Sequence, residues 1–414
     1  MTSPAAVYRA RRGGLWAQSA DTRELWVRRR IGITWGLLLL NVLTFYPRTW
    51  SGLPLAVPIP SPVGKIITQG ALPAALFMAM TVNRRIAIRP NVFLCLLTLL
   101  VIESVLSCLQ AQHIGTIYRT ARFAGFGATL WLLTPWWGRR DLLLLRCHLK
   151  ALGVVLGSVI VGAIVAPTDA FGGNRLGGAL WPFPPTQVAH FAAILTGLVV
   201  VMWLSGLVSG RIAFLVSAVA IACLLLTHTR TALLAMVAGI FVAGLSLFVA
   251  RARVRKLFAV LGVILSIGAM TLSGFVTTWL ARGESTNQLT SLTGRTTVWS
   301  AVLSAPRNVF QELFGFGLSN LSFNGLPIDS NWLGAYFDLG IVGVIICAAM
   351  VLFPLISGYL QPRSAQRALG LFLATYLLLS SFTETGLSDA NVYLLELALA
   401  ASLLVPPIPD RGSS

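Results

Sequence analysis

The sequence has few charged residues, and acidic residues are the scarcer kind. Only 11% of its 414 residues are charged, whereas 56% are hydrophobic and the mean hydropathy is +0.80. An ordinary soluble domain carries about 25% charged residues, so this composition excludes a soluble cytosolic enzyme. Because a membrane-spanning helix needs about 20 apolar residues, the chain has room for roughly a dozen spans and for no second large soluble domain.

Basic residues outnumber acidic residues by 31 to 13, which leaves a formal net charge of +18. In a soluble chain this excess would indicate a nucleic-acid partner. Here the arginines stand in short clusters between apolar runs, which is the distribution that the positive-inside rule produces in membrane proteins. We therefore expect the charge to set the topology, with a lipid bilayer as the partner and no nucleic acid.

The sequence also lacks the patterns of disulfide, nucleotide and metal chemistry. Its five cysteines all stand inside apolar runs, away from loops in which an oxidising compartment would pair them. It has no Walker A loop, no GxSxG elbow and no dinucleotide-binding glycine pattern. The histidines fall in different predicted spans, with no spacing typical of zinc, at His113, His148, His190 and His228. We expect no metal and no cofactor.

Apolar runs bounded by charged residues or by Pro and Gly clusters predict an all-α, polytopic integral membrane protein with about twelve transmembrane helices. The predicted spans are 31–46, 63–82, 91–110, 118–137, 142–165, 187–207, 212–228, 230–250, 257–275, 331–356, 368–384 and 391–406. They form one transmembrane domain over 31–406. An Arg-rich tail precedes it at 1–30, and a short tail follows it at 407–414.

The distribution of basic residues predicts the orientation of these spans. If the N-terminus is cytoplasmic, 22 of the 31 basic residues fall on the cytoplasmic side, and an even number of spans places the C-terminus there too. One long external segment, 276–330, then lies between the ninth and tenth spans, and a shorter one occupies 166–186. Within the long segment, the spacing of apolar residues over TGRTTVWSAVLSA predicts an amphipathic helix at the membrane surface.

Basic residues on the external side are the best functional candidates, because the positive-inside rule disfavours them there. The planar fork of an arginine suits phosphate oxygens, although each could instead reach toward lipid headgroups. Arg230 is notable because almost no loop surrounds it, and Arg119 and Arg122 are spaced to share one helix face. The external basic residues are Arg48, Lys65, Arg119, Arg122, Arg175, Arg230, Arg282, Arg295 and Arg307.

Carboxylates on the external side supply candidate general bases for a hydroxyl acceptor. Asp329 stands where the long segment re-enters the membrane, next to Trp332, whose ring could stack on a sugar. The alternative is that Asp329 only caps the helix predicted to begin near Asn331. Glu384 is a further external carboxylate, which we expect either to pair with Arg230 or to contact the acceptor.

Four segments carry a resemblance to a known family: NRLGGALWPFPPTQVAH (174–190), LLLTHTRTALLAMVAG (224–239), TGRTTVWSAVLSAPRNVFQELFGFGLSN (293–320) and DSNWLGAYFDLGIVG (329–343). Together they resemble the O-antigen ligase and Wzy-type polysaccharide polymerase superfamily of bacterial membrane glycosyltransferases. The first resembles the family's Arg-Leu-x-Gly loop, and the second its Ser-Arg segment, with Thr229 in the Ser position. The third resembles its Gly-Arg-x-x-x-Trp helix.

This resemblance implies an inverting transfer of a glycan from an undecaprenyl diphosphate carrier to an acceptor hydroxyl at the outer face of the bacterial plasma membrane. No metal or nucleotide sugar takes part, and other polysaccharide export proteins are expected partners. The family's donor-binding arginines match Arg230 and Arg295. We expect Arg119, Arg122 and Arg175 to complete the diphosphate site, and Trp299, Trp332 and Glu384 to contact the acceptor or its sugar.

The fourth segment departs from the ligase pattern, because Asp329 stands at the position of the ligase histidine. A carboxylate can also act as the base, so Asp329, Arg230 and Arg295 are the expected catalytic residues. The departure favours a polymerase, or a ligase with another acceptor, over a lipid A core ligase. The competing hypothesis is a transporter or flippase of lipid-linked oligosaccharide, which would place charges along a central path through many helices.

Overall fold

The protein is described here by a computed structural model that covers residues 4–43, 61–111, 113–248, 251–256, 259–260, 295–319, 322–323 and 326–406. Helices dominate, and the structure is 78% helical. Strands within the described ranges are limited to a short antiparallel hairpin, in which β1 (Ser322–Phe323) pairs with β2 (Leu326–Pro327). The all-α prediction is therefore confirmed.

The bundle is built from the following elements in chain order. The first half contains α1 (Pro4–Val42), α2 (Ser61–Val82), α3 (Val92–Ala111), α4 (Ile114–Leu132), η1 (Thr134–Trp136), α5 (Leu143–Val165), α6 (Pro167–Ala170), η2 (Gly172–Asn174), α7 (Pro185–Leu204), α8 (Gly210–Leu226) and α9 (Arg230–Phe248). The second half contains α13 (Arg295–Ser304), α14 (Val309–Phe314), the hairpin, α15 (Asn331–Leu360), α16 (Ala365–Ser380) and α17 (Val392–Leu404).

Every predicted span except 257–275, of which the structure describes only residues 259–260, coincides with a helix. Among the described residues, six helices are long and apolar enough to cross a membrane: Pro62–Val82, Val92–Gln110, Leu143–Val165, Pro185–Leu204, Arg230–Phe248 and Asn331–Leu360. The apolar helices α8, α16 and α17 are shorter. The protein is thus a membrane protein with transmembrane helices, and the count of twelve spans stays a prediction. The predicted tail 1–30 is continuous with the first span, because α1 runs unbroken from Pro4.

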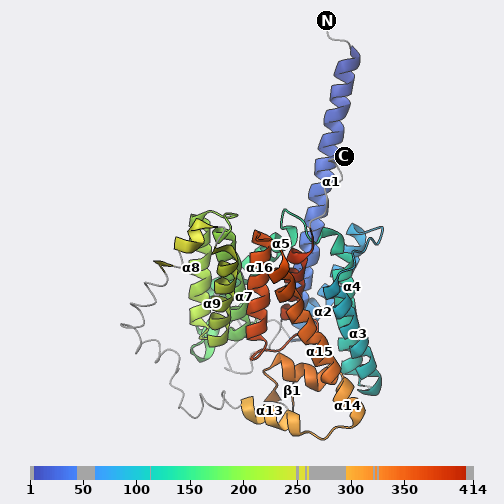
Figure 1. The fold of residues 1–414 in the computed structure, drawn as a ribbon, viewed down its shortest axis with the longest axis vertical. Helices are drawn as coiled ribbons and strands as arrows, with labels where there is room; N and C mark the ends of the chain where they lie inside the picture. The colour runs from blue at the N-terminus through green and yellow to red at the C-terminus, as the bar shows by residue number, and fades with distance from the viewer. Residues whose placement is uncertain are drawn as a thin grey trace.

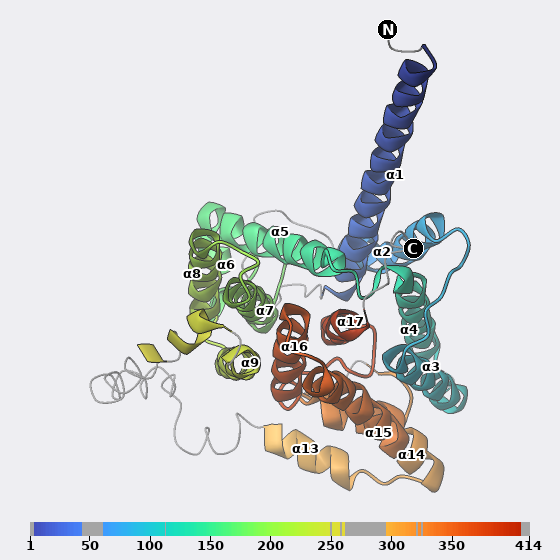
Figure 2. The ribbon, with the colours of Figure 1, turned by 45° about the horizontal axis from the view of Figure 1, so that its top comes forward.

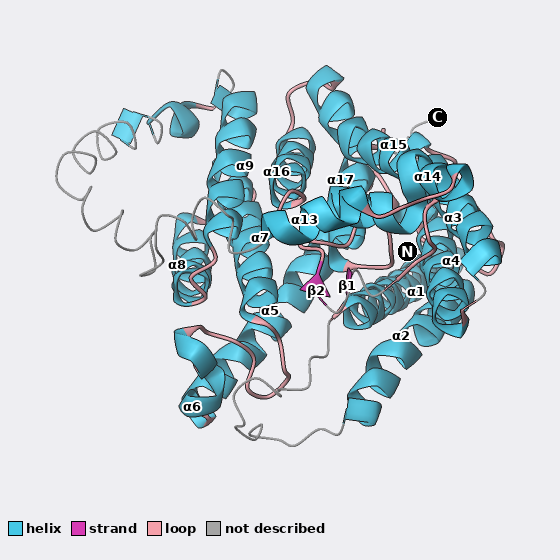
Figure 3. Cartoon of the chain, turned by 90° about the horizontal axis from the view of Figure 1, so that it is seen from below, coloured by secondary structure: helices cyan, strands magenta, loops and turns pink. Residues whose placement is uncertain are grey.

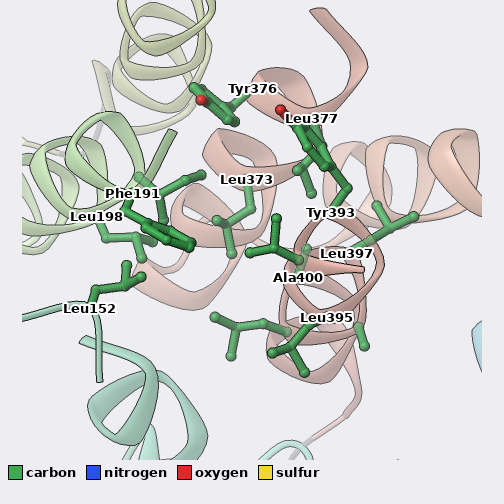
Figure 4. Packing of buried hydrophobic residues seen from close by; sticks show 14 of the residues in the cluster. Leu152, Phe191, Leu198, Leu373, Tyr376, Leu377, Tyr393, Leu395, Leu397 and Ala400 are labelled. Carbon is green, nitrogen blue, oxygen red and sulfur yellow. The ribbon is translucent and has the colours of Figure 1, made fainter. Parts of the chain in front are cut away.

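The helices α7, α16 and α17 form the centre of the bundle, with the other helices around them (Figure 2). Side chains of α7 such as Phe191 and Leu198 face Leu373 of α16 and the apolar side of α17 (Figure 4). The ring of Phe372 fits against Gly197 of α7 and Gly239 of α9, where any Cβ would meet it at 1.8 and 2.9 Å. This close approach packs α9 tightly against α16.

Large apolar side chains on the outer helices are exposed, which is how a bundle surrounded by lipid differs from a soluble one. Examples are Val154 and Ile164 on α5 and Phe214 on α8, which are 74%, 75% and 72% exposed. In contrast, α7 is buried along nearly its whole length. The burial pattern therefore agrees with a membrane environment.

The two ends of the bundle differ. The N-terminal part of α1 projects from one end, whereas α13, α14 and the hairpin cover the other (Figure 1). Seen from that second end, α13 crosses beneath α16 and α17 (Figure 3). On the α1 side, Arg139 forms an ion pair with Glu24 at 3.2 Å, and the backbone of Gly138 binds Ser402 near the end of α17. We call these the α1 end and the α13 end.

Candidate functional site

The loop before α7 is hydrogen-bonded to the corner between α8 and α9. The backbone N–H of Leu176 donates to the carbonyl of Leu226 at 3.0 Å. The side chain of Arg175 donates through Nε to the carbonyl of Thr227 at 2.9 Å and through Nη2 to the hydroxyl of Thr229 at 3.2 Å. The first two segments of the sequence resemblance therefore meet, and the charge of Arg175 lies beside the start of α9, whose first residue is Arg230.

The corner itself carries backbone strain. His228 has a φ of 53°, in the left-handed region that a side chain with a Cβ seldom adopts. Such a residue costs about 1–3 kcal/mol and is found preferentially at functional sites. The strain allows the chain to reverse between two apolar helices within three residues, so that Thr229 and Arg230 stand at the α13 end.

The α13 helix, which the sequence predicted, begins with an ion pair. Nε of Arg295 lies 3.1 Å from Oδ2 of Asp329, and both side chains keep contact with solvent, at 26% and 39% exposure. The side chain of Ser330, and not that of Asp329, caps α15 by accepting a hydrogen bond from the N–H of Leu333. The capping interpretation of Asp329 is therefore wrong, and its carboxylate is available for other contacts.

Glu384 lies within electrostatic range of Arg175 and of the Arg295–Asp329 ion pair. It lies in the connection between α16 and α17, outside the helices, and burial raises its pKa from 4.5 to about 7. The charges of His190, Arg295 and Arg175 oppose this rise in pKa, whereas that of Asp329 adds to it. A carboxyl group near these arginines therefore titrates close to neutral pH, which is the range in which a general base works well. We call Arg175, Arg230, Arg295, Asp329 and Glu384 the arginine cluster.

Arg119 and Arg122 form a second cluster on the same α16–α17 connection. Both face Asp389, at 3.7 and 3.4 Å, which confirms that they share one face of α4. Arg122 also donates to the carbonyls of Ala390 at 2.8 Å and Asn41 at 3.1 Å. These contacts give Arg122 a structural role in joining α4, α1 and the α16–α17 connection.

A break in α15 positions the residues around both clusters. Gly340 has φ +64° inside α15, and its missing Cβ leaves room for the backbone of Leu313, 2.4 Å from where that atom would be. The N–H groups of Phe316 and Gly317 donate to the carbonyls of Phe337 and Asp338, at 3.0 and 2.9 Å. The Phe-Gly-Phe-Gly segment that begins at the last residue of α14 thus fills the break and donates to its carbonyls.

Aromatic residues line the entry to α15. The indole N–H groups of Trp299 on α13 and Trp332 on α15 are buried and have no hydrogen-bond acceptor within the described ranges. Trp332 also packs against Phe382, with ring centroids 6.1 Å apart. Arg307 instead supports the fold, because it donates to the carbonyls of Val302 and Tyr336 and lies 4.0 Å from the Tyr336 ring. These two buried indole N–H groups are exceptions to the rule that a buried indole donor finds a partner.

Two histidines that looked unrelated in the sequence come together in the core, so the expectation that they do not cluster is wrong. Nε2 of His190 lies 2.7 Å from Oε2 of Glu396, and Nε2 of His148 lies 3.5 Å from Oε1 of the same carboxylate. His148 accepts a hydrogen bond from Trp35, and His190 contacts the hydroxyl of Tyr376 at 3.1 Å. Buried charged groups need partners. The presence of Glu396, His148 and His190 inside apolar runs was therefore the sequence feature that could have indicated this network.

The structure thus gathers Arg175, Arg295, Asp329 and Glu384, with Arg230 beside them, and places Arg119 and Arg122 in a neighbouring ion pair. Arg48 and Arg282 lie outside the described residues. Among the residues described, no group of three His, Cys, Asp or Glu side chains could hold a metal ion. No protein-family model matches this chain, and no curated protein matches it either.

Proposed function

We propose that this protein is a membrane glycosyltransferase, a polysaccharide polymerase or an O-antigen ligase-like enzyme, at the outer face of the bacterial plasma membrane. Its donor would be a glycan on undecaprenyl diphosphate and its acceptor a hydroxyl group, with both termini cytoplasmic. The observation that carries this proposal is the arginine cluster, in which three cations and two carboxylates from separate segments gather at the α13 end.

The arginines of the cluster suit a lipid diphosphate. Arg230 and Arg295 are the first residues of α9 and α13, so the N–H groups at both helix N-termini add to the positive potential. The side chain of Arg175 is already oriented by Thr227 and Thr229. Fixed cations of this kind stabilise the charge that develops on a departing diphosphate, which is the electrostatic part of catalysis.

We assign the base to Glu384 and a positioning role to Asp329. Arg295 holds the carboxylate of Asp329, whereas the pKa of Glu384 is about 7. In the proposed step the acceptor oxygen attacks the anomeric carbon and its proton passes to Glu384. The bond from that carbon to the diphosphate oxygen breaks, and its electron pair leaves with the lipid diphosphate. The free indole donors of Trp299 and Trp332 would then bind sugar hydroxyls.

The alternative function is a transporter or flippase of lipid-linked oligosaccharide. The observation in its favour is the interruption of α15 at Gly340, because discontinuous helices often form substrate sites in transporters. In this protein, however, the interrupted backbone is bound by Phe316 and Gly317. The carbonyls that a transporter would offer to an ion or substrate are occupied, so the enzyme is the better-supported proposal.

Two measurements on the purified protein test the assignment of roles. Replacing Arg175 or Arg295 by Gln should weaken binding of undecaprenyl diphosphate about tenfold to a hundredfold, the range expected for a hydrogen bond to a charged group. The exposed Arg363 at the α1 end serves as the matched control, and Arg363→Gln should leave binding unchanged. Equal weakening in all three variants would contradict the proposed donor site.

The pH profile of turnover separates the two carboxylates. The wild-type rate should rise with pH through about 7 and then level off, as Glu384 ionises. Asp329→Asn should lower the rate but keep this rise with pH, the acidic limb of the profile. Glu384→Gln should remove this limb and most of the rate. A limb that persists in Glu384→Gln and disappears in Asp329→Asn would return the base to Asp329.

A further inference from the structure

A groove between α1 and α5 lies apart from the arginine cluster and has no part in the proposed reaction. Its volume is about 1010 Å³, at the upper end of the roughly 300–1,000 Å³ that ligand sites occupy. It runs from basic residues at the α1 end toward Trp181 and Phe183 in the loop before α7. The wall between these ends is apolar, with Leu40 of α1 and Val154 of α5 among its residues.

The mouth of the groove at the α1 end carries a concentrated positive charge. Arg28 is neutralised there, because it pairs with Glu24 and Asp141, both at 2.9 Å. The other basic residues of the mouth, Arg29, Arg146 and Lys150, are exposed. Arg146 and Lys150 are four residues apart and so share one face of α5. Three cations therefore converge on the opening of an apolar groove.

Glycine residues create the space inside the groove. At Gly32 a Cβ would meet Sγ of Cys147 at 3.5 Å, so α1 and α5 are in contact there. At Gly36, one turn further along α1, a Cβ would meet nothing within 4 Å. Space therefore opens beside Gly36, just past the basic mouth. From Arg29 to Leu43 the groove follows α1 for about 21 Å at the usual helical rise, which is enough for an extended hydrocarbon chain.

We propose that this groove binds an anionic phospholipid, with its phosphate at Arg29, Arg146 and Lys150 and an acyl chain along Gly36 and Val154. The basic mouth matches such a ligand, since anionic headgroups attract basic residues at the cytoplasmic leaflet, and the apolar wall of the groove suits an acyl chain. A second copy of the chain is a poorer occupant. A two-fold contact through this groove would place the same three cations against themselves.

Native mass spectrometry of the purified full-length protein tests this proposal. The protein is titrated with dioleoyl phosphatidylglycerol and with dioleoyl phosphatidylcholine, which differ in headgroup charge and share their chains. The charge variant carries Arg29→Gln, Arg146→Gln and Lys150→Gln. Its matched control carries Arg84→Gln, Arg85→Gln and Arg363→Gln, which remove the same charge from exposed residues at the α1 end outside the groove. Gly36→Phe fills the groove without touching its charges.

We expect the wild-type protein and the matched control to retain one phosphatidylglycerol in preference to phosphatidylcholine. The charge variant should lose about fivefold in phosphatidylglycerol affinity per basic residue, and so about a hundredfold in all. Gly36→Phe should lose both lipids, and glycerol 3-phosphate, which lacks chains, should not compete. Equal affinity of the wild-type protein for both lipids, or equal losses in the charge variant and its control, would overturn the proposal. The outcome of this lipid-binding test is independent of the proposed glycosyl transfer, because the assay contains no glycan.

Discussion

The raised pKa of Glu384 predicts that an ionisable group at the proposed active site reduces the stability of the folded protein. The unfolded chain releases this proton near pH 4.5, whereas the folded protein holds it until about pH 7. Between these values the folded state binds more protons, so its stability falls as the pH rises and becomes constant above about 7. A shift of this size corresponds to about 3 kcal/mol. Partial exposure of the side chain reduces the expected effect to about 1–3 kcal/mol.

The assay compares thermal unfolding of the wild-type protein and of Glu384→Gln in one detergent over pH 4.5 to about 8.5. Other titrating groups are common to both proteins, so the difference between them isolates Glu384. The two should be equally stable at the acidic limit, and the glutamine variant should be the more stable by about 1–3 kcal/mol above pH 7. A variant that is less stable at every pH would refute the reasoning, because it would mean that the ionised carboxylate stabilises the fold.

Three further predictions concern the elements that position the site. Arg175→Lys keeps the charge but loses the two hydrogen bonds to Thr227 and Thr229. It should therefore weaken undecaprenyl diphosphate binding almost as much as Arg175→Gln. Full affinity in the lysine variant would contradict a positioning role for these hydrogen bonds. Gly340→Ala should lower the melting temperature, since the backbone at this position (φ 64°, ψ −163°) is one that essentially only glycine adopts and costs alanine about 1–3 kcal/mol before its Cβ meets Leu313, whereas Gly153→Ala, with open space around it, should be neutral or stabilising. Glu396→Leu should destabilise the protein by about 3–5 kcal/mol, because it removes the hydrogen-bond partner of His190 and the carboxylate beside His148, and Glu396→Gln by less; the reverse order in thermal unfolding would exclude this network.

Helix positions could be predicted from the sequence because each is determined by local composition. Apolar runs of about 20 residues predicted nearly every described helix of the bundle, and the spacing of Arg119 and Arg122 predicted their shared face. The helix that begins at Arg295 was likewise indicated by apolar spacing alone. In each case the information lies within one or two turns of the residues concerned.

Partners across the bundle could not be predicted, because they depend on packing between distant segments. Asp389 pairs with arginines more than 260 residues earlier in the chain, and nothing in the local pattern marks it. Glu396 brings together two histidines from different helices. The break at Gly340 was also missed, since a glycine in an apolar run does not itself reveal which segment will fill the space beside it.

The most direct test of the proposed function is turnover in proteoliposomes that contain the purified protein and undecaprenyl diphosphate-linked oligosaccharide, without metal or nucleotide. We expect release of undecaprenyl diphosphate with growth of the glycan or its transfer to an added acceptor, lost in Arg295→Ala and kept in Arg363→Ala. Movement of the lipid-linked oligosaccharide across the bilayer, with no new glycosidic bond under any condition, would contradict the account and establish the flippase.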